Sequence, residues 1–121
     1  MMKKILIVDD EPLNLEILQL YLEDYDVQAF DSAVGCLAYL EAQLPDLVLM
    51  DSHMPEMSGL DACLMIRAKP EWQHLPLVMV SAFADQQHID EALDNGFDDY
   101  LSKPFTEEAL MSVVNRYLQS R

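Results

Sequence analysis

The sequence predicts an α/β protein with a doubly wound, five-stranded parallel sheet, for which we take the order 2-1-3-4-5, one of the common orders of such sheets. Two observations lead to this class. Short apolar runs alternate strictly with longer segments of helical periodicity. The runs are apolar on both faces, which is typical of strands buried in a parallel sheet. We therefore expect one domain over residues 1–121, with right-handed crossovers and helices on both sheet faces.

The predicted strands are short and solidly apolar. The clearest are the first, Ile5-Leu6-Ile7-Val8, and the third, Leu47-Val48-Leu49-Met50. Each of these two runs ends at an acidic residue. We expect the five strands near residues 4–8, 26–30, 46–50, 76–80 and 98–101.

The predicted helices have recognisable starts. Pro12 suits a first helical position, with Asp10 or Glu11 near the cap. Capping residues for the later helices are Asp31 or Ser32, Ser58, Asp85 and Thr106. The helices are expected near residues 12–23, 32–43, 58–68, 85–94 and 106–119.

Two helices differ in their apolar pattern. The last one has a single stripe, made of Leu110, Val113, Val114, Tyr117 and Leu118. The first has two stripes: Leu15, Leu18 and Leu22, then Leu13, Ile17 and Leu20. We expect one wide buried face there. The alternative is that the second stripe docks a partner helix.

The charge balance excludes several classes of partner. Seven basic and 22 acidic residues give a net charge of -15, which repels nucleic acid and anionic membranes. No apolar run has the length of a membrane span or of a signal-peptide core. Cys36 and Cys63 form no CxxC motif and are interpreted as core thiols in a reducing compartment. We therefore expect a cytoplasmic protein that contacts neither nucleic acid nor membrane through this domain.

Acidic residues follow two of the predicted strands. Asp9 and Asp10 come after the first, and Asp51 after the third. The carboxyl ends of neighbouring parallel strands form the crevice where such sheets bind ligands. Three converging carboxylates call for a cation, and their oxygens suit Mg²⁺, with Mn²⁺ as an alternative ion.

Two further residues are expected in the same crevice. Ser81 ends the fourth predicted strand, and Lys103 follows the fifth. Three anions, one cation and one hydroxyl suit a phosphoryl group, because metal and ammonium neutralise its oxygens and the hydroxyl donates to one of them.

The chain resembles a response-regulator receiver domain, of the chemotaxis-regulator type, over its whole length. Four segments carry the resemblance: Ile7-Val8-Asp9-Asp10-Glu11-Pro12, the stretch from Leu49 to Gly59, Val80-Ser81-Ala82, and the stretch from Asp98 to Phe105. The resemblance implies the flavodoxin-like (βα)5 receiver fold and a role in two-component signalling or a phosphorelay.

The resemblance also implies roles for single residues. Asp51 would be the phosphoacceptor and form an acyl phosphate. Asp10 and Asp51 would bind Mg²⁺ directly, with Asp9 acting mainly through water and His53 through its backbone carbonyl. Lys103 would pair with Asp51 and with the phosphoryl group. The Lys103-Pro104 peptide bond would be cis. Ser81 and the backbone N–H of Ala82 would bind phosphoryl oxygens.

Switching is implied as well. Phosphorylation would draw Ser81 inward, and Tyr100 would repack behind it, remodelling the face of the fourth helix, fifth strand and fifth helix. Ser81 replaces the commoner Thr, which loses the methyl that limits rotamers. Phe97 either alters this face or fills core. Phe83, two residues after Ser81, predicts slow self-dephosphorylation, because its ring cannot orient water by a hydrogen bond and would shield the phosphoryl bond. The alternative is that His53 compensates.

Several functions and outputs remain in competition. The favoured one is a signalling domain that receives phosphate from a sensor histidine kinase or a histidine phosphotransfer protein and acts on a downstream protein effector. An aspartyl-phosphate hydrolase is disfavoured, because the DxDxT motif is missing, and a flavodoxin-like cofactor binder lacks a Gly-rich loop. A stand-alone regulator is expected. The alternative is the N-terminal receiver of a larger regulator with an output domain beyond Arg121.

Overall fold

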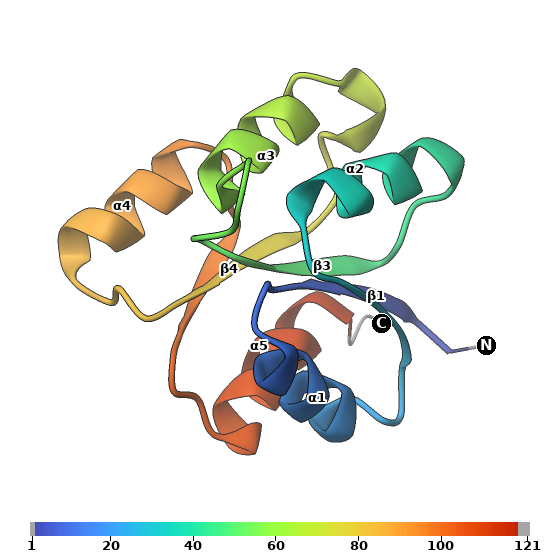
Figure 1. Cartoon of the computed structure of the whole chain (residues 1–121), viewed down its shortest axis with the longest axis vertical. Coiled ribbons are helices and arrows are strands. Elements are labelled where there is room, and N and C mark those ends of the chain that lie inside the picture. The colour runs from blue at the N-terminus through green and yellow to red at the C-terminus, as the bar shows by residue number, and fades with distance from the viewer. Residues whose placement is uncertain (1, 119–121) are drawn as a thin grey trace.

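The computed structural model describes residues 2–118, which form one parallel sheet in the order β2-β1-β3-β4-β5 and confirm the predicted topology (Figure 1). Each strand lies within one residue of its expected position. Their bounds are β1 (Lys4–Val8), β2 (Asp26–Phe30), β3 (Leu47–Asp51), β4 (Leu77–Ser81) and β5 (Asp99–Ser102).

Helices cover both faces of the sheet. The α-helices within the described residues are α1 (Pro12–Tyr21), α2 (Ala33–Ala42), α3 (Gly59–Arg67), α4 (Gln86–Asp94) and α5 (Glu107–Leu118). α1 and α5 lie on one face, and α2, α3 and α4 on the other (Figure 1). The predicted end of the last helix at residue 119 lies outside the described residues.

The first strand explains why the apolar runs are continuous. Ile5 and Ile7 pack into the core beneath α1 and α5, whereas Leu6 and Val8 pack into the core beneath α2 and α3. All four are at most 1% exposed. Side chains alternate between the faces of a strand, so a sheet covered on both sides needs apolar residues at every position.

The predicted caps are largely confirmed. The Ser32 hydroxyl accepts a hydrogen bond from the Gly35 N–H at 3.2 Å. Equivalent side-chain caps begin the later helices at Ser58, Asp85 and Thr106. α1 differs, because Glu11 occupies the cap position without a side-chain bond, and a carboxylate oxygen of Asp9 accepts from the Glu11 N–H instead.

The prediction of one wide buried face on the first helix is wrong. Leu18 and Leu22 are buried, whereas Leu13 and Leu20 are each 65% exposed and Ile17 is half-buried. α1 therefore packs on the sheet through its first stripe only, and the second stripe faces solvent. Helical periodicity finds both stripes but does not say which one meets the sheet.

Sequence reasoning missed the short 3₁₀ helix η1 (Pro70–Trp72), because three residues carry no periodicity. Trp72 is 5% exposed and joins the core beneath α2 and α3. The Arg67 guanidinium donates to the backbone oxygens of Trp72 and Gly96, which ties this connection to the loop before β5.

Burial settles the interpretation of the two cysteines and of Phe97. Cys36 and Cys63 are free and fully buried, as predicted, and burial raises the pKa of Cys36 to about 12 and that of Cys63 to about 11. Phe97 is 3% exposed and fills the same core. Each helix of the described chain is too short or too polar for a bilayer span.

Candidate functional site

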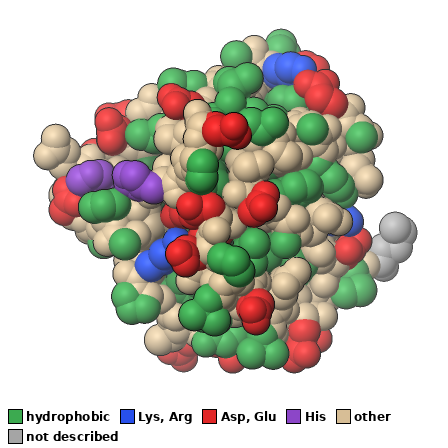
Figure 2. All heavy atoms as spheres, viewed as in Figure 1, with side chains coloured by type: hydrophobic (Ala, Val, Ile, Leu, Met, Phe, Trp, Pro, Cys, Tyr) green, Lys and Arg blue, Asp and Glu red, His purple; other side chains and the backbone are tan. Residues whose placement is uncertain are grey.

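The predicted site residues meet at the carboxyl edge of the sheet. Asp9 follows β1, Asp51 ends β3, Ser81 ends β4 and Lys103 follows β5. These four strands are neighbours in the sheet, so the parallel topology places their ends side by side. Acidic side chains are spread over the visible face of the molecule, with few lysines or arginines among them (Figure 2).

The three carboxylates form one cluster. One oxygen from each of Asp9, Asp10 and Asp51 lies within 4.8 Å of the others. Asp9 is 1% and Asp51 7% exposed, whereas Asp10 is open to solvent. An all-oxygen donor set that is open on one side fits Mg²⁺, which takes one or two carboxylates and keeps several waters.

Lys103 is the cation of this cluster. Its ammonium donates to a carboxylate oxygen of Asp9 at 2.8 Å and of Asp51 at 3.1 Å. Burial acts to lower the pKa of Lys103, but the hydrogen bonds to both carboxylates outweigh it and raise the pKa. The ammonium therefore stays charged at neutral pH. The Lys103-Pro104 bond is cis, as predicted.

Opposing effects act on the pKa of Asp51. Burial, and then the charge of Asp9, raises the pKa of Asp51. Hydrogen bonds from Lys103 and from the Ser52 N–H at 2.9 Å partly offset the rise. A carboxylate with a raised pKa is more basic and a stronger nucleophile, provided that a neighbouring cation offsets its charge.

Ser81 is in the predicted place but has an unpredicted partner. It is 1% exposed, and its hydroxyl lies 2.8 Å from the hydroxyl of Ser52. The Phe83 N–H donates to the same oxygen at 3.1 Å. Sequence reasoning missed Ser52; the available signal was a second hydroxyl directly after the proposed nucleophile.

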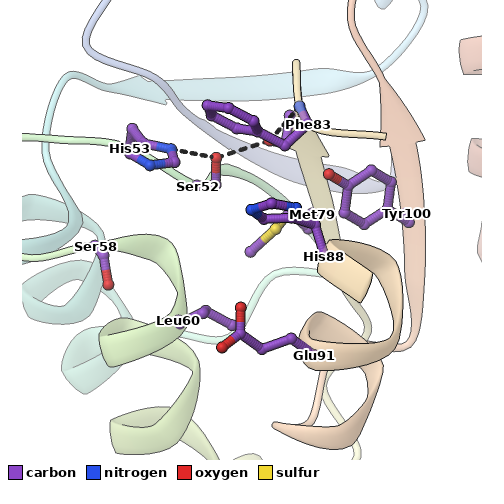
Figure 3. Close-up of a pocket in the computed structure, with 10 residues that line it drawn as sticks. Ser52, His53, Ser58, Leu60, Met79, Phe83, His88, Glu91 and Tyr100 are labelled. Carbon is purple, nitrogen blue, oxygen red and sulfur yellow. Dashed lines mark hydrogen bonds between the residues drawn. The ribbon is translucent and has the colours of Figure 1, made fainter. Parts of the chain in front are cut away.

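A cavity of about 170 Å³ opens beside these hydroxyls (Figure 3). Ser52, Ser81 and Tyr100 line it, and the Tyr100 hydroxyl is buried with no hydrogen-bond partner among residues 2–118. Ala82 is exposed and lies along a different hollow, which it shares with Lys103. The predicted switch residues Ser81 and Tyr100 therefore line the same cavity, whereas Ala82 lines a different one.

Three rings that line this cavity contact one another, with Phe83 stacked on His88 and tilted against His53. The Phe83 ring lies 5.0 Å from that of His53 and 5.1 Å from that of His88, measured between centroids. Phe83 is still 46% exposed. The Asp85 carboxylate binds the His88 ring at 2.5 Å. Sequence reasoning did not assign His88 a role, because it lies outside every motif.

Comparison with known proteins points to one family. The model of the response regulator receiver domain matches residues 5–115. The chain is 36% identical over 115 residues to the signal transduction histidine-protein kinase BarA of Escherichia coli K12, covering 93% of the chain and 12% of BarA. It is 35% identical to the DNA-binding response regulator MtrA of Mycolicibacterium smegmatis, covering 98% of the chain and 52% of MtrA.

A solved structure has the same fold. The receiver domain of sensor histidine kinase PA1611 from Pseudomonas aeruginosa PAO1 superposes with a TM-score of 0.90 at 30% identity, covering 99% of the chain and 100% of that domain. That structure has a magnesium ion coordinated in its active-site cleft. The chain spans at most about half the length of BarA and MtrA.

Proposed function

The chain belongs to the response regulator receiver domain family of two-component signalling, and we propose that it accepts a phosphoryl group on Asp51 in a Mg²⁺-dependent reaction. The donor is the phosphohistidine of a sensor histidine kinase or a histidine phosphotransfer protein. Receiver domains act in signalling rather than as enzymes on a separate substrate. In this proposal the protein catalyses only its own phosphorylation and dephosphorylation.

One observation carries the proposal: the Asp51 carboxylate lies beside two sources of positive charge, the Lys103 ammonium and a carboxylate cluster that fits a cation. Lys103 contacts its Oδ1 at 3.1 Å, and Asp9 and Asp10 complete a cation site within 4.8 Å. In the transfer, a carboxylate oxygen of Asp51 attacks phosphorus, the P–N bond to the donor imidazole breaks, and the imidazole leaves after taking up a proton.

The carboxylate cluster is assigned to Mg²⁺, with Mn²⁺ as the alternative ion. Asp10 and Asp51 would be direct ligands, Asp9 would act through water, and the backbone carbonyl of His53 would add a further oxygen. Bound metal neutralises the oxygens of the transferring group. The Lys103 ammonium would also neutralise these oxygens, because it lies 3.1 Å from Asp51, and it donates to Asp9 as well.

The remaining roles concern the switch. Ser81 and the backbone N–H of Ala82 would bind phosphoryl oxygens, and Tyr100 would repack against the cavity that it shares with Ser81. The face of α4, β5 and α5 would then present a changed surface to a downstream protein effector. Contact with nucleic acid through this domain is disfavoured by the net charge of -15.

Two arrangements would pass the signal on: a stand-alone protein, or a receiver within a longer protein. We favour a stand-alone regulator that works by protein contact. The alternative is a receiver that forms one part of a longer protein, as the aligned regions of BarA and MtrA do.

Phosphorylation with a small donor tests the proposal. The protein, incubated with phosphoramidate and Mg²⁺, should form one hydroxylamine-labile adduct, detected by intact mass. Asp51→Asn should form none, and the control Asp61→Asn, which changes an exposed acid on α3, should label normally. An adduct that persists in Asp51→Asn contradicts the assignment. Turnover of many donor equivalents without a retained phosphate would indicate a hydrolase instead.

A further inference from the structure

The hydroxyl of Ser81 has two hydrogen-bond partners among residues 2–118, a second hydroxyl and a backbone N–H, and neither is a carboxylate. Its oxygen lies 2.8 Å from the Ser52 hydroxyl and accepts from the Phe83 N–H at 3.1 Å. Ser52 in turn lies 2.9 Å from Nδ1 of His53, which extends the chain of contacts along the rim of the cavity (Figure 3).

The partners, rather than sterics, set the direction of this hydroxyl. Serine lacks the second heavy substituent on Cβ that restricts threonine, so the Ser81 side chain turns freely unless a hydrogen bond holds it. A hydroxyl carries one proton and accepts up to two bonds. At 1% exposure, Ser81 has little access to water as a substitute partner.

We propose that Ser52 is a positioning residue that holds Ser81 in its resting orientation and so opposes its turn toward a phosphoryl group on Asp51. This inference rests on the proposed function. Ser52 is suited to the task because it contacts both residues: its hydroxyl binds Ser81, and its N–H donates to Oδ1 of Asp51 at 2.9 Å. A phosphoryl oxygen and the Ser52 hydroxyl therefore compete for one side chain.

The effect has a predictable size. The loss of one neutral hydrogen bond from the resting orientation of Ser81 corresponds to about a fivefold change in the equilibrium between its resting and turned orientations. Removing the Ser52 hydroxyl should therefore tighten the binding of a phosphoryl analogue about fivefold. Ser52 is half-buried on a loop, so truncation to alanine leaves the core intact.

Beryllofluoride, an analogue of the phosphoryl group on aspartate, is the probe. Its dissociation constant is measured in saturating Mg²⁺ by NMR titration for the wild type, Ser52→Ala, Ser52→Thr, Ser81→Ala and the double alanine variant. Ser52→Ala should bind about fivefold more tightly than the wild type. Ser52→Thr, which keeps the hydroxyl, should bind like the wild type. In the Ser81→Ala background, Ser52→Ala should change nothing.

The outcomes separate the two proposals. A wild type that does not bind beryllofluoride with Mg²⁺ contradicts the proposed function. If the wild type binds and Ser52→Ala binds equally or more weakly, the positioning role is overturned. A tightening that persists without the Ser81 hydroxyl also overturns it, because Ser52 would then act on the site directly.

Discussion

A β-carbon on Gly59 would lie only 2.3 Å from the backbone oxygen of Asp51 and 3.2 Å from the Cα of Ser52. The Gly59 N–H also donates to the backbone oxygen of Ser52 at 3.0 Å. The first residue of α3 therefore packs directly against the backbone of the proposed phosphoacceptor, and only glycine permits this approach.

Gly59→Ala should move the Asp51 backbone. The obstacle is main chain rather than a flexible side chain, so we expect a destabilisation of about 1–3 kcal/mol and slower phosphorylation by small donors. Chemical denaturation and the labelling rate measure the two effects. The matched control is Gly35→Ala, where the nearest atom is the Phe30 side chain at 3.1 Å. Equal losses in both variants would contradict the assigned contact.

Lys103→Met should leave Asp9 and Asp51 without their shared cation. Because both acids are largely buried but Lys103 is partly solvated, we expect a loss of about 1–3 kcal/mol in EDTA. Mg²⁺ should restore part of it by supplying the missing positive charge, while phosphorylation stays impaired. Thermal unfolding with and without Mg²⁺ measures this. Lys69→Met, which breaks an exposed pair with Glu41, is the control and should respond little to Mg²⁺.

Asp51→Asn should be more stable than the wild type in metal-free solution at neutral pH. The native pKa of Asp51 lies above the ordinary 3.8, chiefly through burial, so the folded state binds this proton more tightly than the unfolded state. That stabilisation is complete at low pH and is lost as the pH rises through the native pKa. Asparagine does not titrate, so the variant lacks this pH dependence of stability. The advantage of the variant in Tm should therefore grow between about pH 4 and pH 7.

Added Mg²⁺ provides the check on this prediction. The wild type should gain stability from the metal, and the variant should gain less because it lacks one carboxylate. A wild type that is already the more stable protein in EDTA at pH 7 would show that Lys103 overcompensates the burial of Asp51.

Phe83→Ala should shorten the lifetime of the phosphorylated protein several-fold. The ring is stacked on His88 and tilted against His53 beside the site, and it has no group that orients water by a hydrogen bond. Its loss should admit water to the acyl phosphate. Decay of the labelled protein, followed by intact mass, measures the lifetime, and Phe83→Leu, which keeps apolar bulk, is the control. A markedly longer lifetime in Phe83→Ala would eliminate the shielding role.

Local pattern was sufficient for much of this fold. Continuous apolar runs ended by Asp9 and Asp51 predicted buried parallel strands, because only a sheet covered on both faces tolerates them. Parallel strands align their ends, so the sequence predicts Lys103 beside both carboxylates. The predicted caps succeeded for the same reason, since a cap depends on residues within one turn.

The sequence by itself therefore determined the alternation of parallel strands and helices, the helix starts and, once a common strand order is taken, the charged groups that meet at one edge. Tertiary structure alone decided that Leu13 and Leu20 face solvent and that the Ser81 hydroxyl lies within hydrogen-bond distance of the Ser52 hydroxyl. The physical reason is that these features depend on interactions between residues far apart in the sequence. Burial of a helix stripe and the direction of a hydroxyl depend on side chains brought together from distant elements, and periodicity along one segment carries no record of those neighbours.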